Sequence, residues 1–506
     1  MWRDVNMMPA QAPEPIADVC LIAEGCYPYV AGGVSTWIDW LIRSHPELTF
    51  TVLAILPSAP TSEPRYARPD NLLSIEHVRL DDNNMGTTHE WPAATPEYTG
   101  ELIGQLLTDG DTQHLSELMK LLGPPGRRVS LDTLLNSPEA WQTMCYHYGS
   151  MAHASFLGYF WAWRTLVGGL FRVLTCPLPQ ARIYHAVSTG YAGLIGARAA
   201  IETGRKTLIT EHGIYSNERR IEILMADWIS NSIDNGLDLS DDRKDIRELW
   251  ARSFESFARV AYNSATEIVA LYEANQTFQL ALGAGPEKLS VIPNGVDSER
   301  FGKIKPVSHD RPTIAFIGRV TPIKDVQTFI DVAERLRRRF PDLHALVIGP
   351  MDEDPEYAQS CITEVNRRQL ADTVSFTGPV NVVDYLGRID VLVLTSISEA
   401  LPLVILEAGA AGVPCIATDV GACRDILEGP AHDGEPIGPG GMVAPVGAND
   451  EIALAIGLLL ADRQRLHAYG DNLQRRVRKH YRAEAVADAY GALYGRNFAP
   501  QPQMVS

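Results

Sequence analysis

The amino-acid sequence predicts an α/β protein with two Rossmann-like, doubly wound domains that face each other across a cleft. Apolar runs of strand length alternate with helical patterns in both halves of the chain, as expected for parallel sheets covered by helices. Each half opens on a strand, a turn and a helix, at 18–43 and again at 313–336. The length of 506 residues also exceeds the roughly 250–300 residues at which single cores stop growing.

The pattern divides the chain into two domains and a terminal helix. We assign residues 1–300 to the N-terminal domain, with a helical and irregular insertion at about 57–180. Residues 301–482 make the C-terminal domain, which begins with a linker at 301–311. Residues 483–506 are predicted to form a helix that crosses back to the N-terminal domain. We expect strands at 18–24, 49–56, 183–187, 206–210, 267–271, 289–297, 313–318, 344–349, 373–378 and 389–395.

The composition is that of a globular protein with an acidic surface. The chain has 44 lysine and arginine residues against 62 aspartates and glutamates, a net charge of −18, which opposes nonspecific binding to nucleic acid or anionic lipid. Its seven cysteines are scattered without a Cys-x-x-Cys pair, so neither a disulfide framework nor a zinc site is supported. Because the N-terminus also lacks the apolar core of a signal peptide, we expect a cytoplasmic protein.

The most apolar stretch lies inside the predicted insertion, at 156–172. Arg164 interrupts it and Arg172 ends it, so it falls short of the roughly 20 apolar residues of a membrane span. We predict a buried helix; a patch that faces a membrane or a partner protein is the alternative.

A glycine pair follows the first predicted strand. Because Gly32 and Gly33 lack a Cβ atom, they allow the backbone to approach a ligand closely, with a plain tight turn as the alternative. The turn is not Gly-x-Gly-x-x-Gly, which argues against a nicotinamide or flavin cofactor.

Two histidines are candidates for lining the cleft. His185 lies in a predicted strand and His212 directly follows another. The carboxyl ends of strands carry the ligands in open α/β sheets, so both histidines are expected near a ligand. A purely structural role is the alternative for each.

Two cations follow the first strand of the C-terminal half. Arg319 and Lys324 lie in the turn after 313–318. Together they can neutralise a diphosphate and the charge that builds as it leaves. Solvated loop cations are the alternative.

Two glutamates, Glu399 and Glu407, flank the start of a predicted helix at 403–411. Glu399 lies in the loop after a buried strand, whereas Glu407 lies about 8 Å along the helix from Pro402, at roughly 1.5 Å per residue. The free N–H groups of the helix start suit a diphosphate. Two acceptor-only carboxylates beside an anion site suit a ligand with hydroxyls at both ends, such as a nucleotide sugar. Chance spacing is the alternative.

Taken in order, these motifs resemble the retaining GT-B glycosyltransferases of the GT4 class. The resemblance rests on Gly32-Gly33, Pro293-Asn-Gly-Val-Asp297, the basic turn from Gly318 to Asp325, and Glu399-x7-Glu407. More narrowly, the stretches from Glu24 to Trp37 and from Thr210 to Arg219 are similar to the PelF transferases of Pel exopolysaccharide synthesis. The resemblance implies a GT-B fold, a UDP-sugar donor, a polysaccharide acceptor, no metal or other cofactor, and an inner-membrane synthesis and export complex as partner.

The resemblance also implies roles for the donor site. Glu399 would hold the hydroxyls of the donor sugar and Glu407 the ribose. Arg319 and Lys324 would hold the diphosphate. The remaining contacts would come from backbone at Gly33, at Leu403 and Val404, and near the base at Thr377 to Val380.

The implied reaction is a front-face displacement in which the acceptor attacks from the side that the diphosphate leaves. Many relatives carry His-x-His where this chain has His185 and Val187, so His185 and His212 are both kept as candidate catalytic histidines. Two short Asp-x-Asp patterns, at 109–111 and 352–354, are expected to be solvated turns and not a metal site. The alternatives are a nucleotide-sugar epimerase of the same architecture and a non-catalytic UDP-binding subunit of an export complex.

Overall fold

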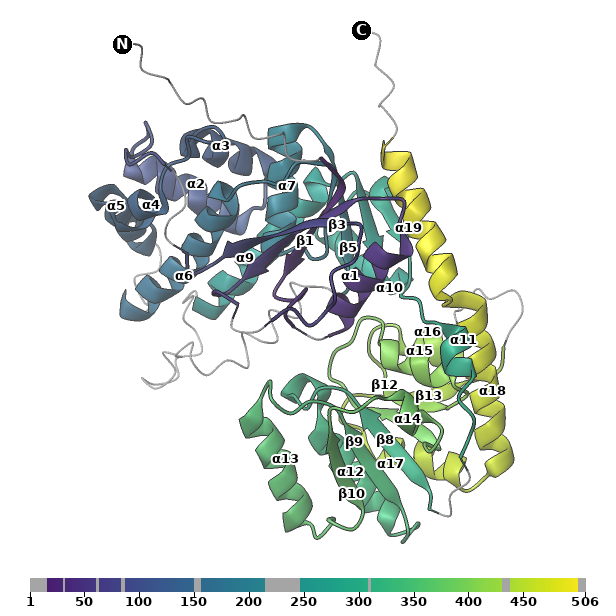
Figure 1. The fold of residues 1–506 in the computed structure, drawn as a ribbon. Coiled ribbons are helices and arrows are strands. Elements are labelled where there is room, and N and C mark those ends of the chain that lie inside the picture. The colour runs from purple at the N-terminus through teal and green to yellow at the C-terminus, as the bar shows by residue number, and fades with distance from the viewer. Residues whose placement is uncertain are drawn as a thin grey trace, which may run out of the picture.

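The computed structural model describes residues 16–30, 32–60, 63–82, 87–149, 156–213, 246–307, 311–429 and 437–498. Two lobes, each with a central parallel sheet between helices, lie one above the other in Figure 1. This confirms the predicted fold class of two Rossmann-like domains.

The N-terminal lobe is built on a seven-stranded parallel sheet in the order β3-β2-β1-β4-β5-β6-β7. Side chains of the first strand alternate between two cores: Leu21 packs on one face and Ile22 on the other. Because both faces are covered, the strand is apolar from Val19 to Ala23. The strands are β1 (Ala17–Glu24), β2 (Phe50–Leu56), β3 (Leu72–Arg79), β4 (Ala181–Ala186), β5 (Lys206–Glu211), β6 (Glu267–Ala270) and β7 (Leu289–Val291).

Helices cover both faces of this sheet. One face carries α1 (Gly33–Ser44) and α19 (Ala483–Phe498), and the opposite face carries α6 (Phe156–Thr175), α7 (Tyr191–Thr203) and α9 (Ile246–Ser264). The sheet is therefore wound on both sides, as a dinucleotide-type domain requires.

The C-terminal lobe repeats this plan with six parallel strands in the order β10-β9-β8-β11-β12-β13. Phe316 packs toward one core and Ile317 toward the other. The strands are β8 (Thr313–Ile317), β9 (His344–Ile348), β10 (Val374–Gly378), β11 (Val391–Leu394), β12 (Cys415–Thr418) and β13 (Gly441–Ala444). The covering helices are α12 (Val326–Arg337) and α17 (Asn449–Leu460) on one face, and α15 (Leu403–Ala410) and α18 (Arg463–His480) on the other.

Three strands were not predicted from the sequence. Strand β3 lies in the stretch interpreted as irregular, and β12 and β13 have only four residues each among Gly- and Pro-rich turns. Gly441 is required in the sheet because a Cβ there would lie 2.0 Å from the carbonyl oxygen of Cys415. A glycine that signals a loop in the sequence therefore serves close strand pairing here.

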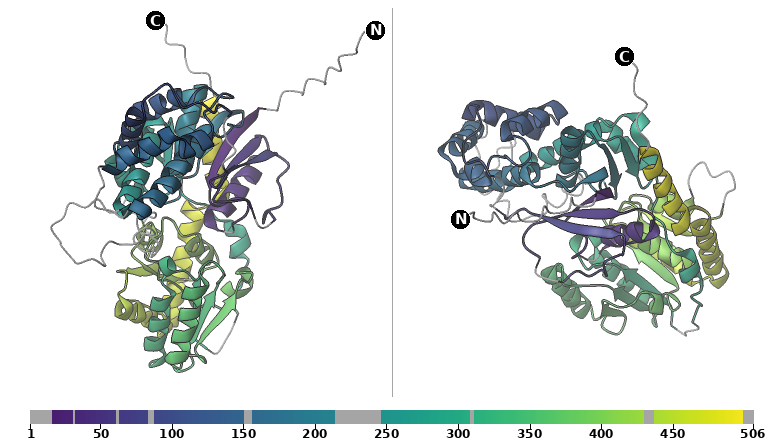
Figure 2. Two further views of the ribbon diagram at one scale, coloured as in Figure 1. Left: turned by 90° about the vertical axis from the view of Figure 1, so that its left-hand side faces the viewer. Right: turned by 45° about the horizontal axis from the view of Figure 1, so that its top comes forward.

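The insertion forms a group of helices on the side of the N-terminal lobe away from α19 (Figures 1 and 2). Helix α6 fills the stretch predicted as a buried helix, but Leu157 and Trp161 in its first turns are exposed. Across the described ranges we find no helix with the length and apolar character to cross a membrane. The other helices of this group are α2 (Pro96–Thr108), α3 (Thr112–Leu122), α4 (Leu131–Asn136) and α5 (Pro138–Tyr148).

The chain passes between the lobes at two places that pair with each other. The N–H group of Val296 donates to the carbonyl of Tyr481 at 2.9 Å, and the N–H group of Ala483 donates to the carbonyl of Val296 at 3.1 Å. The predicted linker at 301–311 is wrong at its start, because Phe301 already packs in the core of the C-terminal lobe. The crossing lies a few residues earlier, directly after β7.

The first testable prediction concerns this crossing. A Cβ on Gly295 would lie 2.7 Å from the Cα atom of Ala483, so Gly295→Ala should force the two crossings apart. We expect the free energy of unfolding to fall by about 1–3 kcal/mol, the usual cost of overpacking, with a lower midpoint of thermal unfolding.

The matched control is Gly495→Ala in α19, where no atom lies within 4 Å of the added Cβ. It should raise stability by up to about 1 kcal/mol, because alanine favours a helix over glycine. Equal stability of Gly295→Ala and the parent protein would contradict the close pairing.

Candidate functional site

A cleft of about 580 Å³ lies between the two lobes. Its walls follow the central strands of both sheets, where the winding of the chain changes direction: β1 and β4 in one lobe, β8 and β11 in the other. Open α/β sheets bind ligands at such switch points. Among the lining residues are Glu24, Gly32, Gly33, Ser188, His212, Asn294, Arg319, Lys324, Glu399, Leu403 and Val404.

An ion pair forms the centre of the C-terminal wall. Lys324 Nζ lies 2.5 Å from Glu399 Oε1, and the hydroxyl of Ser396 donates to the same oxygen at 2.6 Å. The two charged side chains are 19% and 12% exposed. Because the pair is shielded from water, its attraction is stronger than that of a surface pair.

The loops that carry this pair are fixed to each other. Thr395, fully buried at the end of β11, donates its hydroxyl to the carbonyls of Lys324 and Asp325 at 3.1 and 2.9 Å. The N–H group of Ile397 donates to the carbonyl of Ile323 at 2.8 Å. The two predicted site residues therefore belong to one bonded unit, although they lie 75 positions apart.

Arg319 lies at the rim of the cleft. Its Nη1 atom is 2.5 and 2.6 Å from the two carboxylate oxygens of Glu353, and the two side chains are 40% and 46% exposed. Exposed pairs contribute about 0–1 kcal/mol. A more highly charged ligand can therefore take Arg319 from Glu353 at little cost.

Two helix N-termini meet across the cleft. Helix α15 begins at Leu403, and the first N–H groups of a helix lack intrahelical acceptors and attract anions. Gly33, at the start of α1, lies opposite, since a Cβ built on it would be 3.8 Å from Leu403 Cδ1. The start of α1 therefore lies close to the Leu403 side chain, at the start of α15.

Glu407 and Val380 are not among the residues that line the cleft. Glu407 lies one turn inside α15, where burial raises the pKa of its carboxyl to about 7 and the charge of Arg300 partly offsets the effect. Val380 follows β10 and packs against the core of the lobe. Their assignment to the ribose and the base stays a prediction.

His212 follows β5 and lines the cleft. Its ring meets Trp37 of α1 edge-on, with 4.4 Å between ring centroids. Burial lowers the pKa of His212 to about 3, so the imidazole is neutral at neutral pH. Its Nε2 atom is buried without a hydrogen-bond partner among the described residues. A ligand hydroxyl at this point would satisfy an atom that is otherwise costly to bury.

His185 does not line the cleft, contrary to the prediction. It is fully buried in β4, and its two ring nitrogens are hydrogen-bonded to the hydroxyls of Tyr494 and Thr210, each at 2.8 Å. Its side chain faces α19 because alternate side chains of a strand point to opposite faces of the sheet. The role of His185 is to join α19 to the sheet.

Among the lining residues that were not proposed from the sequence are three with polar side chains: Glu24, Ser188 and Asn294. Glu24 Oε2 accepts a hydrogen bond from the N–H group of Ala192 at 3.1 Å, near the start of α7. Asn294 reaches across the lobes, and its Nδ2 atom donates to the carbonyl of Leu401 at 3.3 Å. The available signals were the position of Glu24 at the end of the first strand and the Pro-Asn-Gly turn that contains Asn294.

The described residues contain no group of three or more histidines, cysteines, aspartates or glutamates that could hold a metal ion. In the two Asp-x-Asp patterns, Asp111 and Asp354 accept hydrogen bonds from backbone N–H groups at the starts of α3 and α13 (Pro355–Arg367). The expectation that no cofactor is needed stays a prediction. Of the motif from Thr210 to Arg219, positions 214–219 lie outside the described residues.

Comparison with known proteins adds two family matches. Residues 17–287 match the model described as a domain of unknown function, DUF3492. Residues 297–476 match the model described as glycosyl transferases group 1.

Several named glycosyltransferases are similar in sequence. The D-inositol 3-phosphate glycosyltransferase of Nocardia farcinica is 29% identical over 215 residues, 39% of this chain and 45% of that protein. The alpha-maltose-1-phosphate synthase of Mycolicibacterium smegmatis is 24% identical over 314 residues, 57% of this chain and 72% of that protein. The chain thus spans less than half the length of the first of these relatives.

Two solved structures share the fold over nearly the whole chain. Sucrose-phosphate synthase from Thermosynechococcus elongatus superposes with a TM-score of 0.59 at 16% identity, covering 95% of this chain and 99% of that one. Anabaena HepE in complex with UDP superposes with a TM-score of 0.57 at 15% identity, covering 95% and 100%. Together with the two facing lobes, these likenesses identify the fold as GT-B.

The second prediction concerns Glu407 and pH. A carboxyl whose pKa rises from 4.5 to about 7 on folding binds its proton more tightly in the folded state. The free energy of unfolding should therefore fall as pH rises from about 4.5 to 7, by up to about 3 kcal/mol from this group, and then level off. Glu407→Gln should remove this fall, measured by denaturant unfolding at pH 5, 6, 7 and 8.

The control is Glu451→Gln, which removes an exposed glutamate from α17. It should leave the pH dependence unchanged. The prediction is contradicted if the free energy of unfolding of the parent does not fall between pH 5 and 7 relative to that of Glu407→Gln. Glu407 would then ionise without loss of stability.

Proposed function

The chain belongs to the family of the domain of unknown function DUF3492, and on this premise we propose that it is a retaining glycosyltransferase. It would transfer a hexose from a UDP-sugar to a growing polysaccharide. The observation that carries the proposal is the Lys324–Glu399 pair beside the start of α15 in the interlobe cleft. A cation, a carboxylate and free helix N–H groups are the parts that a diphosphate joined to a sugar requires.

Donor binding would work by an exchange of partners. The diphosphate lies against the start of α15 and draws Lys324 and Arg319 from their carboxylates. Glu399 then loses its cation and accepts hydrogen bonds from the sugar hydroxyls. UDP alone would use only the first half of this exchange, whereas a UDP-sugar would use both.

In the transfer step, the bond between the anomeric carbon and the diphosphate oxygen breaks. Negative charge grows on the leaving oxygen, where Lys324 and Arg319 stabilise it. The acceptor hydroxyl attacks from the same face, its proton passes to the leaving oxygen, and the new glycosidic bond keeps the configuration of the donor. His212 is a poor base because its pKa is near 3, so it would orient a sugar hydroxyl by a hydrogen bond.

The narrower assignment is to Pel-type exopolysaccharide synthesis, in the cytoplasm and with an inner-membrane synthesis and export complex as partner. The support is the similarity of the two N-terminal motifs to PelF transferases, since Gly32, Gly33 and His212 from those motifs line the cleft. The fold neighbour Anabaena HepE was solved with UDP and with UDP-glucose, which supports uracil as the base of the donor.

The third prediction separates the two halves of the donor site by calorimetry on a panel of UDP-, GDP- and ADP-sugars. Lys324→Ala should weaken UDP binding about 10- to 100-fold, since a hydrogen bond to a charged group contributes about 1.5–3 kcal/mol. Glu399→Ala should keep or raise UDP affinity, because Lys324 no longer has to leave a carboxylate for the diphosphate, and should lose the extra affinity of the UDP-sugar.

Lys288→Ala is the control, since Lys288 donates to the backbone carbonyls of Tyr262 and Asn263 away from the cleft. If both site variants bind UDP and UDP-sugars like the parent, the donor site is misassigned. Conversion of a UDP-sugar without any acceptor would instead identify an epimerase, and UDP binding without turnover would identify a non-catalytic subunit.

The fourth prediction tests the transfer with the bound donor and oligosaccharide acceptors. Products of an α-linked UDP-sugar should carry a new α-linkage, read from the anomeric proton coupling in NMR. A β-linkage would exclude the front-face reaction.

A further inference from the structure

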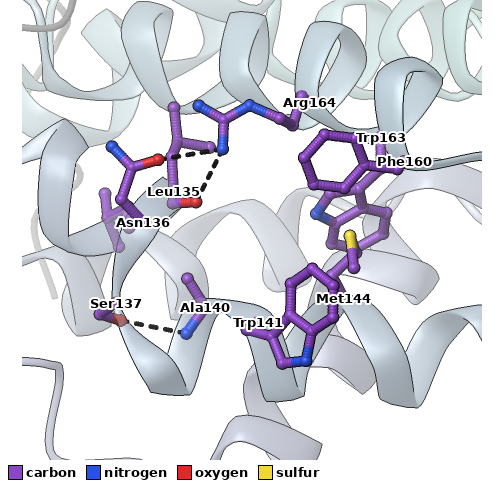
Figure 3. A pocket seen from close by; sticks show the side chains of 10 residues that line it. Leu135, Asn136, Ser137, Ala140, Trp141, Met144, Phe160, Trp163 and Arg164 are labelled. Atoms are coloured by element: carbon purple, nitrogen blue, oxygen red, sulfur yellow. Dashed lines mark hydrogen bonds between the residues drawn. The ribbon is translucent and has the colours of Figure 1, made fainter. Parts of the chain in front are cut away.

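A second pocket, of about 210 Å³, lies in the insertion between α4, α5 and α6. None of its lining residues belongs to the interlobe cleft. Figure 3 shows the guanidinium of Arg164 on one side, the indole of Trp141 on another, and Phe160 and Trp163 along a third. The pocket therefore joins a polar wall to an aromatic one.

The aromatic wall is open to solvent. The Trp141 side chain is 51% exposed, although aromatic neighbours hold it in place: its ring centroid lies 5.9 Å from that of Phe156 and 6.4 Å from that of Phe160. Trp163, deeper in the pocket, is only 5% exposed. The Trp141 indole is therefore a flat apolar surface that is already ordered. A ligand that packs on it loses little affinity to the ordering of this side chain.

The polar wall carries a positive charge. Arg164 Nη1 donates to the carbonyl of Leu135 at 3.1 Å and to Asn136 Oδ1 at 3.0 Å, both neutral oxygens. Within the described ranges Arg164 forms no ion pair, and its guanidinium lies 5.7 Å from the Phe160 ring centroid. A guanidinium has five N–H donors, so those on Nε and Nη2 remain for a ligand.

We propose that this pocket binds one sugar unit of the polysaccharide, away from the site of transfer. A hexopyranose has an apolar face of C–H groups that packs on an indole, and a rim of hydroxyls that accept from a guanidinium. A purely apolar ligand would leave the polar wall unused. The proposal rests on the proposed transferase function only for the identity of the polysaccharide that supplies the sugar unit.

The consequence is a second attachment point for the growing chain. An acceptor held at two places rebinds at high effective concentration, so long acceptors gain affinity that short ones lack. The benefit requires a chain long enough to span both sites. It therefore appears in the dependence on acceptor length and not in the chemical step.

The experiment uses the full-length protein with chitohexaose and maltohexaose as probes, titrated by calorimetry. Trp141→Ala should weaken binding of the better probe at least tenfold, and Arg164→Ala likewise. The matched control is Trp161→Ala, which removes a more exposed indole (59%) of the same helical group that does not line the pocket. It should bind like the parent. Unchanged UDP affinity and thermal midpoint show that each variant is folded.

A kinetic arm links the pocket to the reaction. Trp141→Ala should raise KM for a hexasaccharide acceptor and leave kcat and KM for a disaccharide unchanged. If no acceptor is used but Trp141-dependent oligosaccharide binding persists, the proposed function fails and the pocket stands. Two results would overturn the sugar pocket: equal losses of affinity in Trp141→Ala and Trp161→Ala, or no binding of either probe to the parent protein.

Discussion

The placement of the two lobes depends on the backbone pairing of the two interlobe crossings. Val296 exchanges hydrogen bonds with the segment around Arg482, and Gly295 allows the two crossings to approach because it has no side chain. The preceding residue, Asn294, lines the cleft and bonds to Leu401 in the other lobe. The same short segment thus joins the lobes and forms part of the site. A change in the angle between the lobes would act on this hydrogen bond to Leu401, two residues after Glu399.

The charges of the cleft suit the proposed binding of an anionic donor by an acidic protein. Lys324 and Arg319 are each paired with a carboxylate, so neither presents an unbalanced positive charge to solvent. A simple anion must displace those carboxylates and leaves them without a cation. A ligand that brings hydroxyls together with its phosphates offsets this loss at Glu399. In the proposed function, selectivity for sugar nucleotides over free phosphates would follow from this pairing.

Much of the fold and part of the site could be predicted because the signals are local. Buried parallel strands are continuous apolar runs, and the residues directly after them lie at one edge of the sheet, which located Arg319, Lys324, Glu399 and His212. The features that could not be predicted depend on the orientation of side chains and on contacts between residues far apart in the sequence. Whether His185 points to the cleft or to α19 is set by strand alternation and by a helix some 300 residues later. The exposed Trp141 pocket requires three helices whose packing no local pattern specifies.

The C-terminal helix is part of the support for the cleft, although it contributes none of the lining residues named above. Tyr490 of α19 is hydrogen-bonded to Thr210 at 3.2 Å and lies 5.3 Å from Trp37 between ring centroids. Trp37 in turn packs on His212, which lines the cleft and whose buried Nε2 atom has no hydrogen-bond partner among the described residues. Because protein interiors are closely packed, a change in α19 is transmitted through these rings. The orientation of His212 therefore depends both on the strand before it and on α19. This helix follows the whole C-terminal lobe in the sequence and packs on the N-terminal lobe.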